Sequence, residues 1–198
     1  MVERRALPLF DWDERRRAAR RRRRLALGQG ALIALGCACV AATIAAPPLP
    51  RLVWNASASA PIGLYRVEPV ALVARGDMVL ARTPLSVRAL AAWRHYVPAN
   101  VPLVKRIAGV AGDRVCAAGT RVTLNGRPIA ARRARDRLGR ALPWWKGCRT
   151  LGAGTVFLLM AGVPDSFDGR YFGPTPASDA LGKATPLWVE PSKDPNND

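Results

Sequence analysis

The chain has 198 residues, of which 49% are hydrophobic and 31 are Lys or Arg, and its formal net charge at pH 7 is +17. This length allows one domain with appendages, and the apolar content excludes a disordered chain. Because the chain has a single histidine, His95, a serine-histidine-aspartate hydrolase would depend on that one residue. A large positive charge alone is typical of nucleic-acid-binding proteins, so its position along the chain decides what it means.

The first charged block lies at the N-terminus and is followed by an apolar run. Residues 1–24 hold ten arginines against four acidic residues, and the next 22 residues, 25–46, carry no charge. As a helix that rises 1.5 Å per residue, this run would span about 33 Å, which is enough for a bilayer core. The sequence Pro47-Pro48-Leu49-Pro50 ends any such helix, because proline lacks the amide hydrogen and clashes with the preceding turn.

A basic block directly before an apolar helix is retained on the cytoplasmic side of a membrane. We therefore predict a cytoplasmic segment at 1–24, a single-pass inner-membrane anchor at 25–46 and a periplasmic domain at 51–198. Two alternatives stay open. The small residues at 42–46 also suit the cleavage site of a signal peptide, although the apolar run is longer than is usual for one. The arginines are also compatible with DNA binding instead of a contact with the lipid surface.

The segment from 55 to 65, Asn-Ala-Ser-Ala-Ser-Ala-Pro-Ile-Gly-Leu-Tyr, places two serines among small residues. Small neighbours leave room for a substrate backbone around Ser57 and Ser59. Pro61 and Gly63 favour a turn directly after Ser59. An ordinary Ser/Pro/Gly linker is the alternative interpretation, and it would be preferred if no activating base followed in the sequence.

The rest of the chain carries short apolar runs separated by turns. The patterns predict strands at 78–81, 114–115 and 155–160, a hairpin turn at 124–127, and one helix outside the membrane at 86–95. We therefore predict a mainly β, barrel-like domain.

Lys105 lies inside an apolar stretch. Because side chains alternate between the faces of a strand, Leu103, Lys105 and Ile107 share one face. Loss of hydration on an apolar face lowers the pKa of a lysine, and a neutral amine can accept the proton of a serine hydroxyl. The alternative is a lysine near a strand end that extends to water. The strand pattern alone leaves both interpretations open.

Two further features lie beyond this strand. Cys116 and Cys148 belong to the outer part, where disulfides persist, and we predict that they are bridged. Residues 131–149 form an Arg- and Trp-rich excursion, which we interpret as a solvated arm. The alternative is a membrane-binding arm, in which Trp144 and Trp145 lie at the membrane interface and the arginines contact lipid head groups.

The serine and lysine segments, with a third at Asp165-Ser-Phe-Asp-Gly-Arg-Tyr-Phe-Gly173, resemble the type I signal peptidase family, peptidase S26. The conjugative-transfer, TraF-like branch is the most similar, because it shows Ser-x-Pro-x-Gly-x-Tyr where the general family has Ser-Met-x-Pro. The resemblance covers 55 to about 174 in three blocks. It implies a signal-peptidase-like β-rich domain outside the membrane, preceded by one N-terminal transmembrane helix.

The resemblance also implies site residues. Ser59 matches the nucleophile, Lys105 the general base, Ser57 a serine that assists the oxyanion hole, and Ser166 a serine that orients the lysine. Asp168 matches a supporting acidic residue of the family, and we expect it to pair with Arg170 or Arg106. Gly169 stands where the family pattern has a second serine.

The implied activity is that of a serine endopeptidase that needs no cofactor or metal. Its substrate would be an exported precursor, either a signal peptide or a conjugative propilin, cleaved after small residues; some relatives in this branch join pilin ends instead. The expected partners are this precursor, membrane lipid and a conjugation or secretion apparatus, and no nucleic acid is expected. The alternative function is a non-catalytic, membrane-anchored component of such an apparatus.

Overall fold

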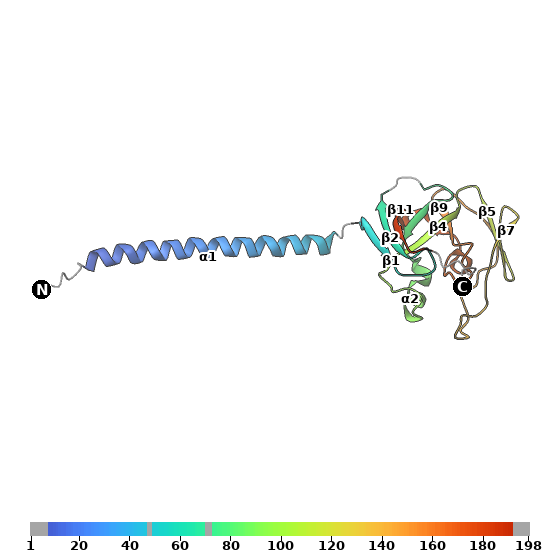
Figure 1. Ribbon diagram of the computed structural model, residues 1–198, viewed down its shortest axis with the longest axis horizontal. Helices are drawn as coiled ribbons and strands as arrows, with labels where there is room; N and C mark the ends of the chain where they lie inside the picture. The colour runs from blue at the N-terminus through green and yellow to red at the C-terminus, as the bar shows by residue number, and fades with distance from the viewer. Residues whose placement is uncertain (1–7, 47–48, 70–72, 192–198) are drawn as a thin grey trace. The chain divides into compact units, whose positions relative to one another are not determined.

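The computed structural model describes residues 8–46, 49–69 and 73–191. The chain divides into two compact units, and the boundary in the sequence falls after Leu49 (Figure 1).

The first unit is one helix, α1 (Pro8–Ala45). It is long and apolar enough to cross a membrane, and apolar side chains such as Leu32 and Ile33 are exposed along it. The helix also takes in the described part of the basic block, because alanine and arginine both favour helix. Pro47 and Pro48, which we expected to end the helix, lie outside the described residues.

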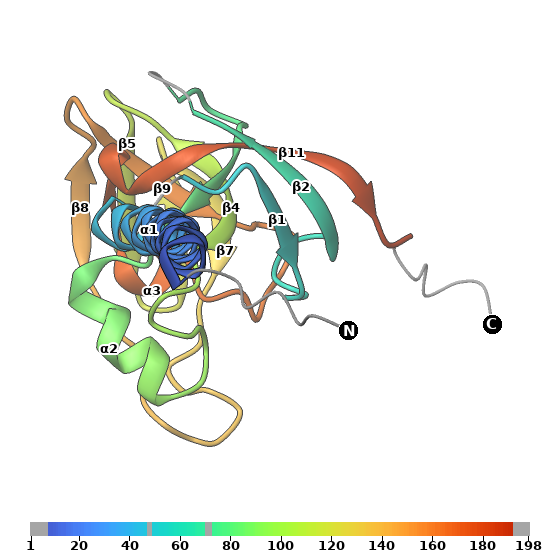
Figure 2. The ribbon, with the colours of Figure 1, turned by 90° about the vertical axis from the view of Figure 1, so that its left-hand side faces the viewer.

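The second unit contains two antiparallel sheets. The larger sheet has seven strands in the order β1 (Leu52–Asn55), β2 (Gly63–Glu68), β11 (Ala180–Val189), β3 (Met78–Ala81), β4 (Leu103–Gly109), β9 (Thr155–Leu159) and β10 (Thr175–Pro176). The smaller sheet has the order β7 (Arg127–Ala131), β6 (Arg121–Leu124), β5 (Arg114–Ala118) and β8 (Gly147–Thr150). Figures 1 and 2 show β1 and β5 on opposite sides of this unit. The predicted mainly β fold is confirmed.

Among the described residues of this unit there are also three short helical segments, which are α2 (Leu85–Trp93), α3 (Gly169–Phe172) and a 3-10 turn at Ala177–Asp179. The predicted helix at 86–95 is confirmed as α2, although it ends before His95, whose φ of 58° is not helical. The predicted strand at 155–160 is confirmed as β9.

The predicted hairpin turn at 124–127 is also confirmed. It joins β6 to β7 through Asn125 and Gly126, whose φ angles of 51° and 81° match the two positive values that this tight turn requires.

Strand β4 lies in the interior of the larger sheet, between β3 and β9. Val104 pairs with Leu80 and Ile107 with Leu158, and all four side chains are buried. On the face of β4 that carries Lys105, Leu103 and Ile107 are buried as well, whereas Arg106 on the other face is exposed. Lys105 therefore belongs to one of the least accessible strands of the unit.

A disulfide joins Cys116 of β5 to Cys148 of β8, as predicted, and the two residues are direct cross-strand partners. This bridge closes a loop that contains residues 131–147 of the Arg- and Trp-rich excursion.

The solvated-arm interpretation of this excursion is wrong for Arg132, Trp144 and Trp145. Arg132 is only 2% exposed, and its guanidinium carbon lies 3.7 Å from the centroid of the Trp144 ring. Trp145 packs against the core cluster that contains Phe157 and donates from Nε1 to the carbonyl oxygen of Gly169 at 3.1 Å. The indole of Trp145 is therefore used for internal packing, which contradicts a place for it at the membrane interface.

Candidate active site

The serine loop between β1 and β2 is held by a buried amide side chain. Asn55, which is 7% exposed, donates from Nδ2 to three carbonyl oxygens of the loop at 2.9 to 3.1 Å, those of Ser57, Ala60 and Pro61. Its Oδ1 accepts the amide hydrogen of Ser57 at 3.2 Å. The hydroxyl of Tyr65 donates to the carbonyl of Pro61 at 2.7 Å. This network fixes the backbone of the loop from both flanking strands.

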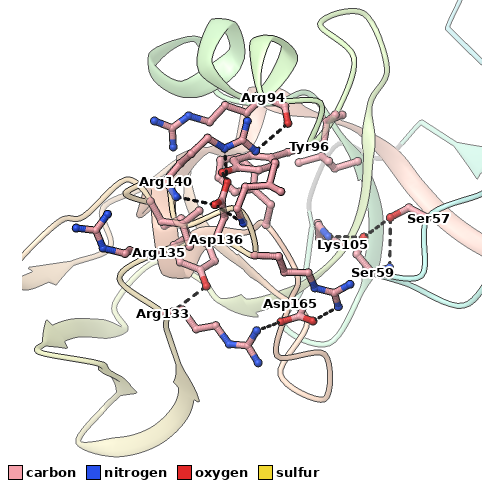
Figure 3. A pocket seen from close by; sticks show the side chains of 17 residues that line it. Ser57, Ser59, Arg94, Tyr96, Lys105, Arg133, Arg135, Asp136, Arg140 and Asp165 are labelled. Carbon is pink, nitrogen blue, oxygen red and sulfur yellow. Dashed lines mark hydrogen bonds and ion pairs between the residues drawn. The ribbon is translucent and has the colours of Figure 1, made fainter.

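Three hydroxyl and amine groups from separate segments meet beside β4. The Nζ of Lys105 lies 2.8 Å from Ser59 Oγ and 2.9 Å from Ser166 Oγ. Ser59 is partly exposed, whereas Ser166 is fully buried. Figure 3 shows Ser59 between Lys105 and Ser57. The structure thus brings an accessible hydroxyl within hydrogen-bond reach of a buried amine.

The environment of Lys105 favours its neutral form. The side chain is 1% exposed, so it does not extend to water as the alternative interpretation required. Burial lowers its pKa from 10.5 to about 8; the Asp168 carboxylate acts in the opposite direction, and the Arg170 guanidinium lowers the pKa further. An amine with this pKa is partly neutral near pH 8 and can then accept a proton.

Ser57 lies beside the hydroxyl of Ser59. Its Oγ donates to Ser59 Oγ at 2.9 Å and accepts the Ser59 amide hydrogen at 3.3 Å. The amide of Ser59 and the hydroxyl of Ser57 are therefore adjacent donors at the mouth of the site. Such a pair of donors is the kind of group that stabilises an oxyanion.

Asp168 and Arg170 form a buried ion pair that holds the segment carrying Ser166. Their side chains are 0% and 1% exposed, and Arg170 Nε lies 2.8 Å from Asp168 Oδ1. The other carboxylate oxygen accepts the amide hydrogen of Met160 at 3.0 Å. Arg170 also donates to the carbonyl oxygens of Met160 and Pro164 at 2.8 and 2.9 Å. Both residues thus position the segment between β9 and α3.

Arg106 does not join this pair, which corrects the supporting role that we expected for it. It is exposed and donates to the carbonyl oxygen of Gly76 at 2.7 Å. The reason is the alternation of side chains along β4, which directs Arg106 to the face opposite Lys105.

A cavity of about 320 Å³ opens in front of the serine-lysine cluster. Ser57, Ser59 and Lys105 line one part of it, and five arginines and two aspartates line the rest (Figure 3). Its apolar lining includes Val97, Leu103, Leu142 and Phe167. His95 is not among the lining residues, so this site offers no serine-histidine pair.

The sequence analysis missed two parts of the site. Asn55 was only the first residue of the serine segment, although an Asn directly before a loop is a recognised signal for side-chain hydrogen bonds to the backbone. The stretch 133–142 is largely exposed, as the solvated-arm interpretation predicts, but it also forms a wall of the cavity. No local pattern reveals this, because it depends on contacts with Asp165 and α2.

Several known proteins are similar to this chain. The profile of the family described as signal peptidase, peptidase S26, matches residues 24–189. A plasmid transfer protein TraF of Escherichia coli is 36% identical over 130 residues, which cover 61% of this chain and 72% of that protein. A second Escherichia coli plasmid transfer protein TraF is 37% identical over 131 residues, with coverages of 61% and 73%. A crystal structure of a signal peptidase I from Enterococcus faecalis aligns with a TM-score of 0.36 and 18% identity, over 59% of this chain and 99% of that one.

Proposed function

Because this chain belongs to the signal peptidase family, peptidase S26, we propose that it is a membrane-anchored serine endopeptidase with Ser59 as nucleophile and Lys105 as general base. The observation that carries the proposal is the 2.8 Å separation between Ser59 Oγ and the buried Nζ of Lys105. A non-catalytic component of a transfer apparatus would have no need for a lysine desolvated beside a serine hydroxyl.

The reaction follows from the positions of these groups. Neutral Lys105 takes the proton of the Ser59 hydroxyl while Oγ attacks the carbonyl carbon of the scissile bond. The Ser59 amide and the Ser57 hydroxyl donate to the resulting oxyanion, and one such donor contributes about 2.7–4 kcal/mol in comparable sites. The Lys105 ammonium then gives its proton to the leaving amine, which leaves an acyl-enzyme. Water attacks the ester, again with Lys105 as base, and releases Ser59.

Ser166 and the Asp168–Arg170 pair act through position. Ser166 holds the Lys105 amine, and the ion pair fixes the segment that carries Ser166. Ordering of a general base by a further group is a recurring requirement of nucleophilic catalysis.

The proposed substrate is an exported precursor, either with a signal peptide or a conjugative propilin, cleaved after small residues. The names of the two Escherichia coli relatives, plasmid transfer proteins, favour the conjugative context and a transfer apparatus as partner. The arginine block before the apolar part of α1 favours an inner-membrane protein whose N-terminus is cytoplasmic and whose catalytic unit is periplasmic.

The proposal is tested with the full chain in membranes and a reporter precursor whose signal peptide ends in Ala-x-Ala. The wild-type protein should cleave the reporter, whereas Ser59→Ala and Lys105→Arg should leave it intact, because a guanidinium stays protonated at working pH. Near-normal cleavage by Lys105→Arg would overturn the lysine-base mechanism.

A further inference from the structure

The part of the cavity wall that faces away from β4 is a short hairpin, residues 133–142, which we call the arginine hairpin. Its two arms are joined by backbone hydrogen bonds from Leu142 to Ala134 and from Asp136 to Arg140. Arg133, Arg135 and Arg137 are spaced two residues apart along the first part of this hairpin. All three line the same cavity as Ser59 and Lys105.

One carboxylate of the cavity is neutralised within the hairpin. Asp136 is largely buried and pairs with Arg140, whose Nε lies 2.6 Å from Oδ2. The hydroxyl of Tyr96 donates to the same oxygen at 2.5 Å. Although burial raises the pKa of Asp136, these hydrogen bonds lower it more strongly. The charges of Asp136 and Arg140 therefore cancel each other, and Asp136 does not offset the charges of Arg133, Arg135 and Arg137.

The second carboxylate, Asp165, is shared by two arginines. The Nη1 atom of Arg133 lies 2.6 Å from Oδ1 of Asp165, and Arg137 pairs with Oδ2. Figure 3 shows Arg133 and Asp165 on the wall of the cavity. The side chain of Asp165 is 40% exposed, so a competing anion can reach the same guanidinium groups. Arg135 donates only to the carbonyl of Gly139, and within the described part of the chain no carboxylate lies within salt-bridge distance of it.

We propose that the arginine hairpin is a specificity site for an acidic side chain of the substrate near the scissile bond, and that Asp165 is its internal counter-ion. This inference rests on the proposed peptidase function. The five arginines and two aspartates of the cavity leave three positive charges in excess, in the same cavity that Ser59 lines. Arginine binds carboxylates in a two-pronged geometry, which provides selectivity as well as attraction.

A peptide is favoured over a lipid head group because these arginines line the cavity that holds Ser59. A ligand that contacts them from inside the cavity is therefore close to the scissile bond. A purely peripheral lipid contact would not require Asp165 as a counter-ion within the cavity.

The test uses the full chain in detergent and two pairs of internally quenched peptides with an Ala-x-Ala cleavage site. Within each pair, two Glu residues replace two Gln residues, either before or after that site. We expect kcat/KM to favour the Glu peptide in one pair at low salt, by up to about fivefold for each ion pair gained. The advantage should shrink at 0.5 M NaCl, because salt screens exposed charges.

Two variants with opposite expected effects sharpen the test. Arg135→Gln combined with Arg137→Gln should abolish the preference for Glu, whereas Asp165→Asn should increase it by releasing two arginines. The matched control is Arg121→Gln combined with Arg127→Gln, which removes the same charge from the exposed β6–β7 hairpin. Loss of the preference in this control would mean that net charge alone is responsible and would overturn the proposal.

Binding separates this inference from the proposed function. Affinities of the Glu and Gln peptides for Ser59→Ala are measured by fluorescence anisotropy, and the Glu peptide should bind more tightly even if no peptide is cleaved. Equal affinities would overturn the specificity site and leave the peptidase function intact. The site would also be overturned if the hairpin variants weakened binding to phosphatidylglycerol vesicles but left the peptide preference unchanged.

Discussion

Ser166 Oγ lies 2.9 Å from Lys105 Nζ at a position that is completely buried. The two residues come from distant parts of the chain, since Lys105 belongs to β4 and Ser166 follows β9. Because solvent does not reach this position, water cannot take over the hydrogen bond between Ser166 and the Lys105 amine if the serine is removed. The side-chain contact therefore determines where the lysine nitrogen points relative to Ser59.

Replacement of Ser166 by alanine should lower kcat with little change in KM. Loss of one such hydrogen bond is worth 0.5–1.5 kcal/mol, or up to about tenfold in rate. The measurement is steady-state cleavage of a quenched peptide, with thermal unfolding to verify that the variant is folded. An increase in KM with kcat preserved would assign Ser166 to substrate binding instead of to the orientation of Lys105.

The rate should depend on pH through Lys105. Because burial lowers its pKa to about 8, the neutral fraction falls about tenfold for each pH unit below this value. A plot of log kcat/KM should therefore rise with a slope of about one up to pH 8 and level off above it. A profile that is flat between pH 6 and 8 would exclude an amine of this pKa as the base.

The buried ion pair should matter far more for stability than an exposed one. In Asp168→Asn the Arg170 charge loses its counter-ion inside the protein, and the free energy of unfolding should fall by about 3–5 kcal/mol. The matched control is Glu68→Gln, because the Arg66–Glu68 pair is more than half exposed and should contribute less than about 1 kcal/mol. Equal effects of the two variants in urea denaturation would show that Asp168 and Arg170 do not depend on each other.

Local sequence patterns predicted the strand that carries Lys105, the strand β9 and the turn at Asn125 and Gly126. These features depend on alternation, apolar runs and backbone preferences, which are properties of neighbouring residues. The same alternation places Arg106 on the face of β4 opposite Lys105. The sequence therefore already argued against the supporting role that we expected for Arg106.

The excursion at 131–149 was not predictable in this way. A run of arginines looks solvated in sequence, but Arg132 is buried by its contacts with Trp144 and with the carbonyl oxygens of Gly119 and Trp145. These partners come together only when the smaller sheet has formed. The cavity wall at 133–142 likewise depends on Asp165, which is remote in sequence.

Loss of the disulfide should destabilise the second unit. The bridge between Cys116 and Cys148 closes a loop with a sequence separation of 32, and bridges of this kind are typically worth about 2–4 kcal/mol. Replacement of both cysteines by serine should lower the urea midpoint by a corresponding amount. A midpoint that is the same for the oxidised, the reduced and the double-serine protein would contradict this expectation.

Gly169 stands where the resemblance described above implies a serine, and the structure leaves little room for a side chain there. A Cβ atom at Gly169 would lie 2.6 Å from the carbonyl oxygen of Leu158 and 2.8 Å from the ring of Phe157. The contact with Leu158 is with the backbone of β9, so it cannot be relieved without a shift of that strand. Gly169→Ser should therefore destabilise the protein by about 1–3 kcal/mol, the usual cost of overpacking.

The matched control for this substitution is Gly162→Ser. A Cβ atom there meets nothing within 4 Å, so the variant should unfold at nearly the wild-type urea concentration. Because Gly169 lies between Asp168 and Arg170, its replacement should also displace the buried ion pair and, through the Ser166 segment, lower kcat. If Gly169→Ser proved as stable and as active as Gly162→Ser, the close packing of Gly169 against β9 would not limit the size of the side chain at this position, and this prediction would be wrong.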